Sequence, residues 1–83
     1  MKPENLSRRI IKDLARYTAD KPMKWVPIET LALRLLLDNI AVVDRALAFG
    51  CAKGWLEIEG GHSVHLTDEG RHVANSMVYN PGD

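Results

Sequence analysis

Two short runs of alternating apolar and polar residues, separated by a pair of glycines, limit the possible folds of this chain more than any other feature. The first run is Trp55 to Glu59, and His62 to Leu66 can return beside it as a second strand. Gly60 and Gly61 lie between the runs, and both can adopt the positive φ that a tight hairpin turn requires. The segment therefore predicts a β-hairpin.

Four other segments carry apolar residues at the three- and four-residue spacings of amphipathic helices. We expect the first helix to run from about Asn5 to near Asp20, the second to start at Pro27, the third to cover residues 39–53, and the last to follow the N-cap residue Thr67. Their apolar stripes are, in chain order, Leu6, Ile10, Ile11, Leu14 and Tyr17; Ile28, Leu31, Ala32, Leu35 and Leu36; Val43, Ala46, Leu47 and Gly50; and Val73, Ala74 and Met77.

A short extended segment is expected at residues 24–26, because a proline disfavours helical geometry in the residue before it and Pro27 follows directly. The predicted order is then helix, short strand, helix, helix, hairpin, helix. Only residues 1–4 and 80–83 lack such a pattern, and we expect them to be frayed.

Several of these segments combine into a known pattern. They are the leucine-rich run from Thr30 to Asn39, then Val43 and Leu47, then Lys53 to Ile58 at the start of the hairpin, and the Leu-Thr-x-x-Gly-Arg run from Leu66 to Arg71. In this order and spacing they resemble the winged helix-turn-helix domain of small bacterial transcriptional regulators, over about residues 6–78. The resemblance implies an α+β fold with a three-helix core, a two-stranded β-hairpin wing and a short C-terminal helix, so that residues 1–83 form a single domain.

A chain of 83 residues buries little surface, so its helix faces and one face of the hairpin must meet in a single core. The predicted core residues are Leu14, Leu31, Leu35, Val43, Leu47, Leu56, Ile58 and Leu66. Gly50 departs from the family pattern, which usually places a large apolar residue there. We expect Phe49, Cys51 or Trp55 to fill the space, and the alternative is the close approach of a partner element.

The resemblance implies that residues 39–53 are the recognition helix, whose outward side chains would reach base edges in the major groove of DNA. Arg45 is the one strong reader of bases or phosphates among them, and Asp44 would repel phosphate. Lys24 and Arg34 would join Arg45 in contacting phosphates. The candidate DNA-contacting residues are Lys24, Arg34, Asn39, Ala41, Val42, Arg45, Ala48, His62, Ser63 and His65.

Two functions follow from this surface. The first is a small DNA-binding transcriptional regulator or accessory protein of the winged-helix type, whose partner is double-stranded DNA. The second is a winged-helix module for protein–protein interaction or dimerisation that does not read DNA, in which Ala41, Arg45, Ala48 and Phe49 dock a partner helix or a second copy. The family pattern favours the first function, and the weakly polar recognition face favours the second.

Charge is balanced overall but uneven along the chain. Eleven basic and eleven acidic residues give a formal net charge of zero, yet residues 1–24 are mainly basic and residues 57–83 mainly acidic. Arg8, Arg9, Lys12 and Arg16 share one polar sector of the first helix, which is either a solvated face or a surface for an anion or a partner.

The composition also limits the location of the chain. No apolar stretch approaches the roughly 20 residues that span a bilayer, and the N-terminal sequence lacks the apolar region of a signal peptide. One cysteine cannot form an internal disulfide. We therefore expect a cytoplasmic protein that does not bind membranes.

Catalytic and metal sites are not expected. The sequence has no nucleophile elbow, phosphate loop or paired catalytic carboxylates, so we expect no enzymatic activity, no catalytic residue and no cofactor. Cys51, His62, His65 and His72 are potential zinc ligands, but their spacing does not form a metal motif. We expect His62 and His65 to be polar residues of the wing and Cys51 to be a small buried residue.

Overall fold

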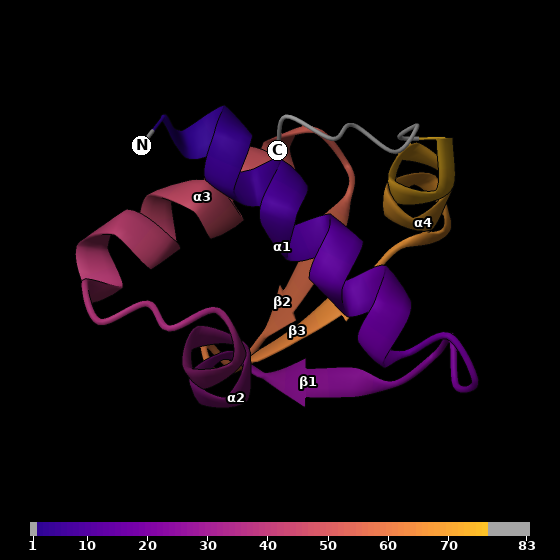
Figure 1. Cartoon of the computed structure of the whole chain (residues 1–83), viewed down its shortest axis with the longest axis horizontal. Helices are drawn as coiled ribbons and strands as arrows, with labels where there is room; N and C mark the ends of the chain where they lie inside the picture. The colour runs from indigo at the N-terminus through magenta and orange to yellow at the C-terminus, as the bar shows by residue number, and fades with distance from the viewer. Residues whose placement is uncertain (1, 77–83) are drawn as a thin grey trace.

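The computed structural model describes residues 2–76, and within them the chain forms four helices and a three-stranded antiparallel sheet (Figure 1). The elements follow the predicted order: α1 (Pro3–Tyr17), β1 (Trp25–Pro27), α2 (Ile28–Arg34), α3 (Ile40–Ala52), β2 (Leu56–Glu59), β3 (Ser63–Leu66) and α4 (Asp68–Ser76). The fold is therefore α+β. Met77 of the expected last helix, residue 78 of the region of resemblance, and residues 80–83 lie outside the described residues.

α1 begins earlier than expected, and residues 3 and 4 are helical rather than frayed. Pro3 suits the first turn because the N–H that it lacks would have no partner in the helix there. Glu4 in the same turn forms an ion pair with Arg8, with 3.3 Å between carboxylate oxygen and Nε. The helix also ends earlier, at Tyr17, where Thr18 donates both its N–H and its hydroxyl to the carbonyl of Leu14.

The sheet contains the predicted two-stranded hairpin, and the predicted short strand, β1, joins it as a third strand, a pairing that the sequence did not predict. β3 is the central strand, with β1 and β2 antiparallel on either side, and Val64 pairs with both Val26 and Ile58. Gly60 and Gly61 have φ of 62° and 72°, as the hairpin turn requires. The pairing of β1 with β3 fastens the start of α2 to the hairpin, because the N–H of Ile28 donates to the His62 carbonyl at 2.8 Å.

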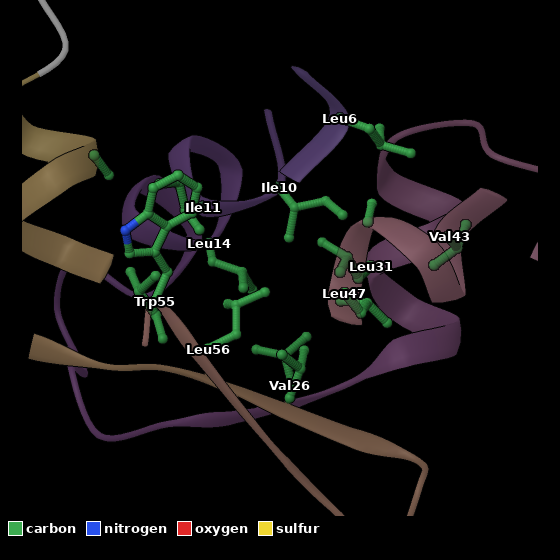
Figure 2. Packing of buried hydrophobic residues seen from close by; sticks show 14 residues of the cluster. Leu6, Ile10, Ile11, Leu14, Val26, Leu31, Val43, Leu47, Trp55 and Leu56 are labelled. Atoms are coloured by element: carbon green, nitrogen blue, oxygen red, sulfur yellow. The ribbon is translucent and has the colours of Figure 1, made fainter. Parts of the chain in front are cut away.

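The core lies between α1, α3 and one face of the sheet. Figure 2 shows Leu6, Ile10 and Leu14 of α1 directed toward side chains from α3 and the strands. Six of the eight predicted core residues are buried: Leu14, Leu31, Val43, Leu47, Leu56 and Leu66. The other two correct the prediction, since Leu35 is only half-buried and Ile58 is 38% exposed. Ile58 lies on an edge strand near the hairpin turn, where the sheet extends past the helices that cover its centre.

Gly50 is buried in α3 at the point where α1 and β2 come closest to it. A Cβ at this position would lie 2.5 Å from Leu56 Cδ1 and 2.8 Å from Ser7 Oγ. The space is therefore filled by Leu56 and Ser7, and the expectation that Phe49, Cys51 or Trp55 fills it was wrong. Contacts within the chain therefore account for a glycine at this position.

The Leu-Thr-x-x-Gly-Arg run joins α4 to the base of the hairpin. Thr67 is the N-cap, as predicted, because its hydroxyl oxygen accepts from the Gly70 N–H at 2.9 Å and donates to the Gly54 carbonyl at 2.6 Å. Gly70 packs directly on the carbonyl of Trp55, and a Cβ there would collide with it. Two residues of the run thus have structural roles.

Arg71 connects α4 to the end of α1. Its guanidinium donates to the carbonyl of Ala15 at 3.4 Å, to Thr18 Oγ1 at 2.8 Å and to the carbonyl of Pro22 at 3.2 Å. The arginine of the motif is therefore also structural. None of the helices in the described range is long and apolar enough to cross a lipid bilayer.

Candidate interaction surface

α3 is positioned by an N-cap at Asn39, the second of two adjacent capping residues that precede the helix. The side-chain oxygen of Asn39 accepts hydrogen bonds from the N–H groups of Ala41, at 3.1 Å, and Val42, at 3.4 Å. This satisfies donors that the first turn of a helix otherwise leaves unpaired. Asn39 is exposed, so its amide nitrogen can still donate to a ligand.

The outward side of α3 is small and weakly charged. Val43, Ala46, Leu47 and Gly50 are buried as expected, which leaves Ala41, Asp44, Arg45 and Ala48 exposed and Val42 half-buried. Arg45 makes no hydrogen bond or ion pair with any residue in the described range. It is therefore the one candidate cation on this side of the helix that is ready to bind a ligand.

Lys24 and Arg34, the other expected phosphate-binding residues, are instead held against α1. Arg34 Nε and Nη2 each donate to a carboxylate oxygen of Asp13 at 2.9 Å, and its guanidinium carbon lies 4.2 Å from the centre of the Tyr17 ring. The hydrogen bond to Asp13 raises the pKa of Arg34 above its ordinary value. Lys24 Nζ lies 5.0 Å from the same ring. A ligand would have to compete with these contacts for either cation.

The hairpin turn packs against the start of α2. His62 is exposed, and its Nδ1 lies 3.0 Å from the hydroxyl of Ser63, which is half-buried. The carbonyl of His62 accepts from the N–H of Ile28, so the turn is tied to the helix. These two polar residues therefore border the surface between α2, α3 and the hairpin.

His65 corrects a prediction, because it is not an exposed polar residue of the wing. It is only 7% exposed, and its ring centre lies 5.0 Å from that of Trp25, its cross-strand neighbour. Nδ1 is buried and has no hydrogen-bond partner among the described residues. Burial on the central strand removes His65 from the side chains that a ligand could reach.

A groove of about 430 Å³ lies between α2, the start of α3 and the hairpin turn. Its lining is mostly apolar and consists of Pro27, Ile28, Glu29, Ala32, Ile40, Gly61, His62 and Ser63. Two of the candidate residues, His62 and Ser63, thus belong to it. Shape and lining suit an apolar side chain.

Three large apolar side chains are exposed in the α2–α3 segment, between Ala32 and Ile40, which line the groove on either side of the turn, and Ile40 is one of the three. Leu33 is 71% exposed, Leu36 is 90% exposed and Ile40 is 62% exposed, and we call these three residues the apolar patch. Sequence reasoning missed the patch because it placed Leu36 in the buried stripe of the second helix. α2 ends at Arg34, so Leu36 turns outward instead. The signal was the nearness of Asp38 and Asn39, since a helix start there forces the preceding helix to end within the leucine run.

Leu36 has an unusual backbone conformation, with φ of 56°. Its N–H donates to the Leu33 carbonyl at 3.3 Å, and the N–H of Leu37 donates to the Ala32 carbonyl at 2.9 Å. These two bonds form a Schellman motif, in which glycine usually occupies the left-handed position. A leucine holds that position here and projects into solvent.

The charges around the groove are mainly acidic. Glu29 lines it, and Asp38 and Asp44 are exposed nearby on the turn and on α3. Glu57 and Glu59 are exposed on β2. Set against the single unpaired Arg45, these carboxylates make the surface unfavourable for phosphate groups.

The remaining candidate groups show no catalytic arrangement. Cys51 is half-buried, and burial, with a smaller contribution from Glu57, raises the pKa of its thiol above the ordinary value. A raised pKa disfavours the reactive thiolate. Within residues 2–76, no three His, Cys, Asp or Glu residues lie close enough together to hold a metal ion.

The basic sector of α1 is partly used by the fold. Arg8 pairs with Glu4 and lies 5.2 Å from the centre of the Trp55 ring. Lys12 is half-buried, whereas Arg16 is exposed. None of the four basic residues of this sector lines the groove.

Comparison of the chain with protein-family models, with curated proteins and with solved structures gave no match.

Proposed function

We propose that the chain is a winged helix-turn-helix domain that acts as a protein-interaction module rather than as a reader of DNA. The fold part of this proposal is supported by the element order, with one helix and one strand before the α2–α3 pair and a hairpin after it. A fold of this kind does not determine function, so the function has to be inferred from the surface.

The observation that carries the proposal is the apolar groove with the apolar patch beside it. Exposed leucine and isoleucine side chains next to a hollow with apolar walls gain free energy when another apolar surface covers them. Contact with phosphate groups or with water gives these side chains no comparable gain in free energy. The surface between α2, α3 and the hairpin therefore suits a partner with protruding apolar side chains.

The electrostatics of the same surface disfavour DNA. Phosphate contacts from Lys and Arg supply most of the affinity of proteins for DNA. Two of the three expected cations, Lys24 and Arg34, contact side chains of α1, and the carboxylate of Glu29 lines the groove. The single unpaired arginine, Arg45, adds little attraction for DNA phosphates against the repulsion from nearby carboxylates.

A second candidate function, a small DNA-binding regulator, is favoured by one observation. Arg45 is exposed and unpaired on the outward side of α3, and Asn39 at the start of the helix keeps a free amide donor. Ala41 and Ala48 beside them are small enough to let the helix approach a groove of DNA. A test with two arms, one with DNA and one with peptides, distinguishes the two functions.

The DNA arm is a titration of the ¹⁵N-labelled chain with mixed-sequence duplex DNA at low and moderate salt. We expect no shift of the amides at residues 39–52 and 59–65. Shifts there that fade as salt is added, and that Arg45→Ala abolishes, would reject the proposal in favour of DNA binding.

The protein arm is a selection of displayed helical peptides on the full chain, immobilised sparsely so that copies do not meet. We expect peptides with an apolar stripe, whose binding is lost in Leu36→Asn and kept in Met23→Asn. Met23 is a matched control because it is 72% exposed and lies in the loop before β1, outside the patch. A selection without any Leu36-dependent binder would count against the protein-interaction module.

A further inference from the structure

We propose that the partner of the apolar patch is a basic amphipathic helix, in which Lys or Arg side chains flank a stripe of apolar ones. This inference rests on the proposed function and names the chemistry of its partner. It is carried by the carboxylates beside the patch, by the positions of the nearest cations and by the backbone of the surface.

The apolar patch is bordered by an exposed carboxylate on α2, on the turn and on α3. Glu29 lies four residues before Leu33, which places both on one side of α2, and Glu29 also lines the groove. Asp44 lies four residues after Ile40, on the same side of α3. Asp38 lies on the turn, two residues before Ile40. We call Glu29, Asp38 and Asp44 the acidic rim.

The charges of the acidic rim are not compensated within the chain. No ion pair to any of its three carboxylates is present within residues 2–76. Three like charges beside an apolar surface repel an acidic partner and attract a basic one, and the attraction strengthens as the partner displaces water from the contact. Charge complementarity therefore favours Lys and Arg next to the apolar side chains of the partner.

The nearest cations of the chain do not neutralise the acidic rim. Arg34 follows Leu33 directly, but both of its hydrogen bonds go to Asp13 on α1, and its guanidinium also contacts the Tyr17 ring. Arg45 lies five residues after Ile40, which places it about 140° around α3 from the patch. The cations that pair with the acidic rim have to come from the partner.

The backbone of the surface favours a helical partner over an extended one. The N–H groups of Leu36 and Leu37 donate to carbonyls of α2, and Asn39 caps the first turn of α3. Residues 28–52 therefore offer no row of free backbone groups with which a strand could pair. A helix satisfies its own backbone, and its apolar stripe can enter the groove of about 430 Å³.

A second display library tests the chemistry of the partner. Its helical peptides of about 18 residues share one fixed leucine stripe, and each position beside the stripe carries Lys, Gln or Glu in equal proportion. Among the peptides whose binding Leu36→Asn abolishes, we expect Lys to exceed Glu about fivefold at these positions. The excess should fall as salt is added, because salt screens exposed charges.

The carboxylates of the acidic rim are the groups to remove. In the triple variant Glu29→Gln, Asp38→Asn and Asp44→Asn, the Lys excess should disappear. Leucine-stripe peptides should still bind, because the apolar patch is intact. A matched control also removes three exposed carboxylates, all outside the acidic rim, and should keep the Lys excess. Its substitutions are Asp20→Asn, Glu57→Gln and Glu69→Gln.

Two results would overturn the basic partner. One is a set of Leu36-dependent peptides with as much Gln or Glu as Lys, which keeps the interaction module and gives it a neutral or acidic helix as its partner. The other is a Lys excess that the rim variant retains or the matched control loses. A library without Leu36-dependent binders rejects the interaction module itself. Self-association that Leu36→Asn abolishes and that a Lys-rich peptide does not displace would assign the patch to a second copy instead.

Discussion

Leu36 is the residue whose conformation departs most from ordinary preference. Its φ of 56° lies in the left-handed region, which carries a penalty of roughly 1–2 kcal/mol for a residue with a Cβ. At 90% exposure the side chain recovers almost none of that penalty by burial in its own chain. The monomer is therefore less stable than the same fold with a different residue at this turn.

We predict that Leu36→Gly raises the free energy of unfolding of the monomer by about 1 kcal/mol, because glycine adopts the left-handed position without strain. Urea unfolding at low micromolar concentration, followed by circular dichroism, measures the change. The control is Leu33→Gly, which removes the same side chain from an exposed helical position. There the loss of helix propensity should lower stability by about 1 kcal/mol. Equal effects of the two substitutions would contradict the argument from strain.

The side chains of the candidate surface show which residue properties a sequence can predict. The outward position of Arg45 on α3 follows from helical spacing, and this prediction was confirmed. Arg34 forms its ion pair with Asp13, 21 residues away, so its engagement depends on how α1 and α2 pack. The burial of His65 likewise depends on β1, which comes from a distant part of the chain. Tertiary contacts of this kind leave no local pattern.

At the scale of elements, α4 depends on the rest of the fold for its stability. Its described part, Asp68–Ser76, is too short to be stable as an isolated helix in water. Three contacts hold it in place: the Thr67 cap, the close packing of Gly70 on the Trp55 carbonyl, and the Arg71 hydrogen bonds to α1 and the following loop. The last of these joins segments about 50 residues apart in the chain.

We predict that Arg71→Met lowers the free energy of unfolding by about 1–2 kcal/mol, since the apolar stem is kept while charged hydrogen bonds are lost. Amide hydrogen exchange should also speed up in α4 more than in α3, because the lost bonds anchor α4 directly. His72→Ala, at the exposed neighbouring position, serves as the control and should change stability by less than about 0.5 kcal/mol. Unchanged exchange in α4 of the Arg71 variant would show that the cap and Gly70 suffice.

Element boundaries were harder to predict than element types. The glycine pair and the alternating residues around it predicted the hairpin, and the N-caps predicted the starts of α3 and α4. The end of α2 was missed because the run from Leu33 to Leu37 continues an apolar pattern without a glycine or proline to mark the stop. β1 was expected as a short extended segment, but its place in the sheet depends on β3, nearly 40 residues later.

At the scale of the whole molecule, one small core must supply nearly all the stability of the monomer. α1 crosses the molecule and contacts α3, the sheet and α4, so the same helix organises every layer (Figure 1). A domain of this size has a narrow margin between folded and unfolded states. The free energy gained when a bound partner covers the apolar patch would therefore be a sizeable fraction of the total stability.

This coupling predicts that a bound partner raises the melting temperature of the chain. A patch-binding peptide from the selection, at about one hundred times its dissociation constant, should stabilise the folded state by about 2.7 kcal/mol and raise Tm by roughly 10–20 °C, because it binds only the folded chain. Leu36→Asn should melt higher than wild type without peptide, where strain alone decides, and its Tm should not change when peptide is added. Met23→Asn should follow wild type throughout. Scanning calorimetry with and without peptide measures all three. If the peptide raises the Tm of the Leu36 variant as much as that of wild type, the apolar patch is not the docking surface.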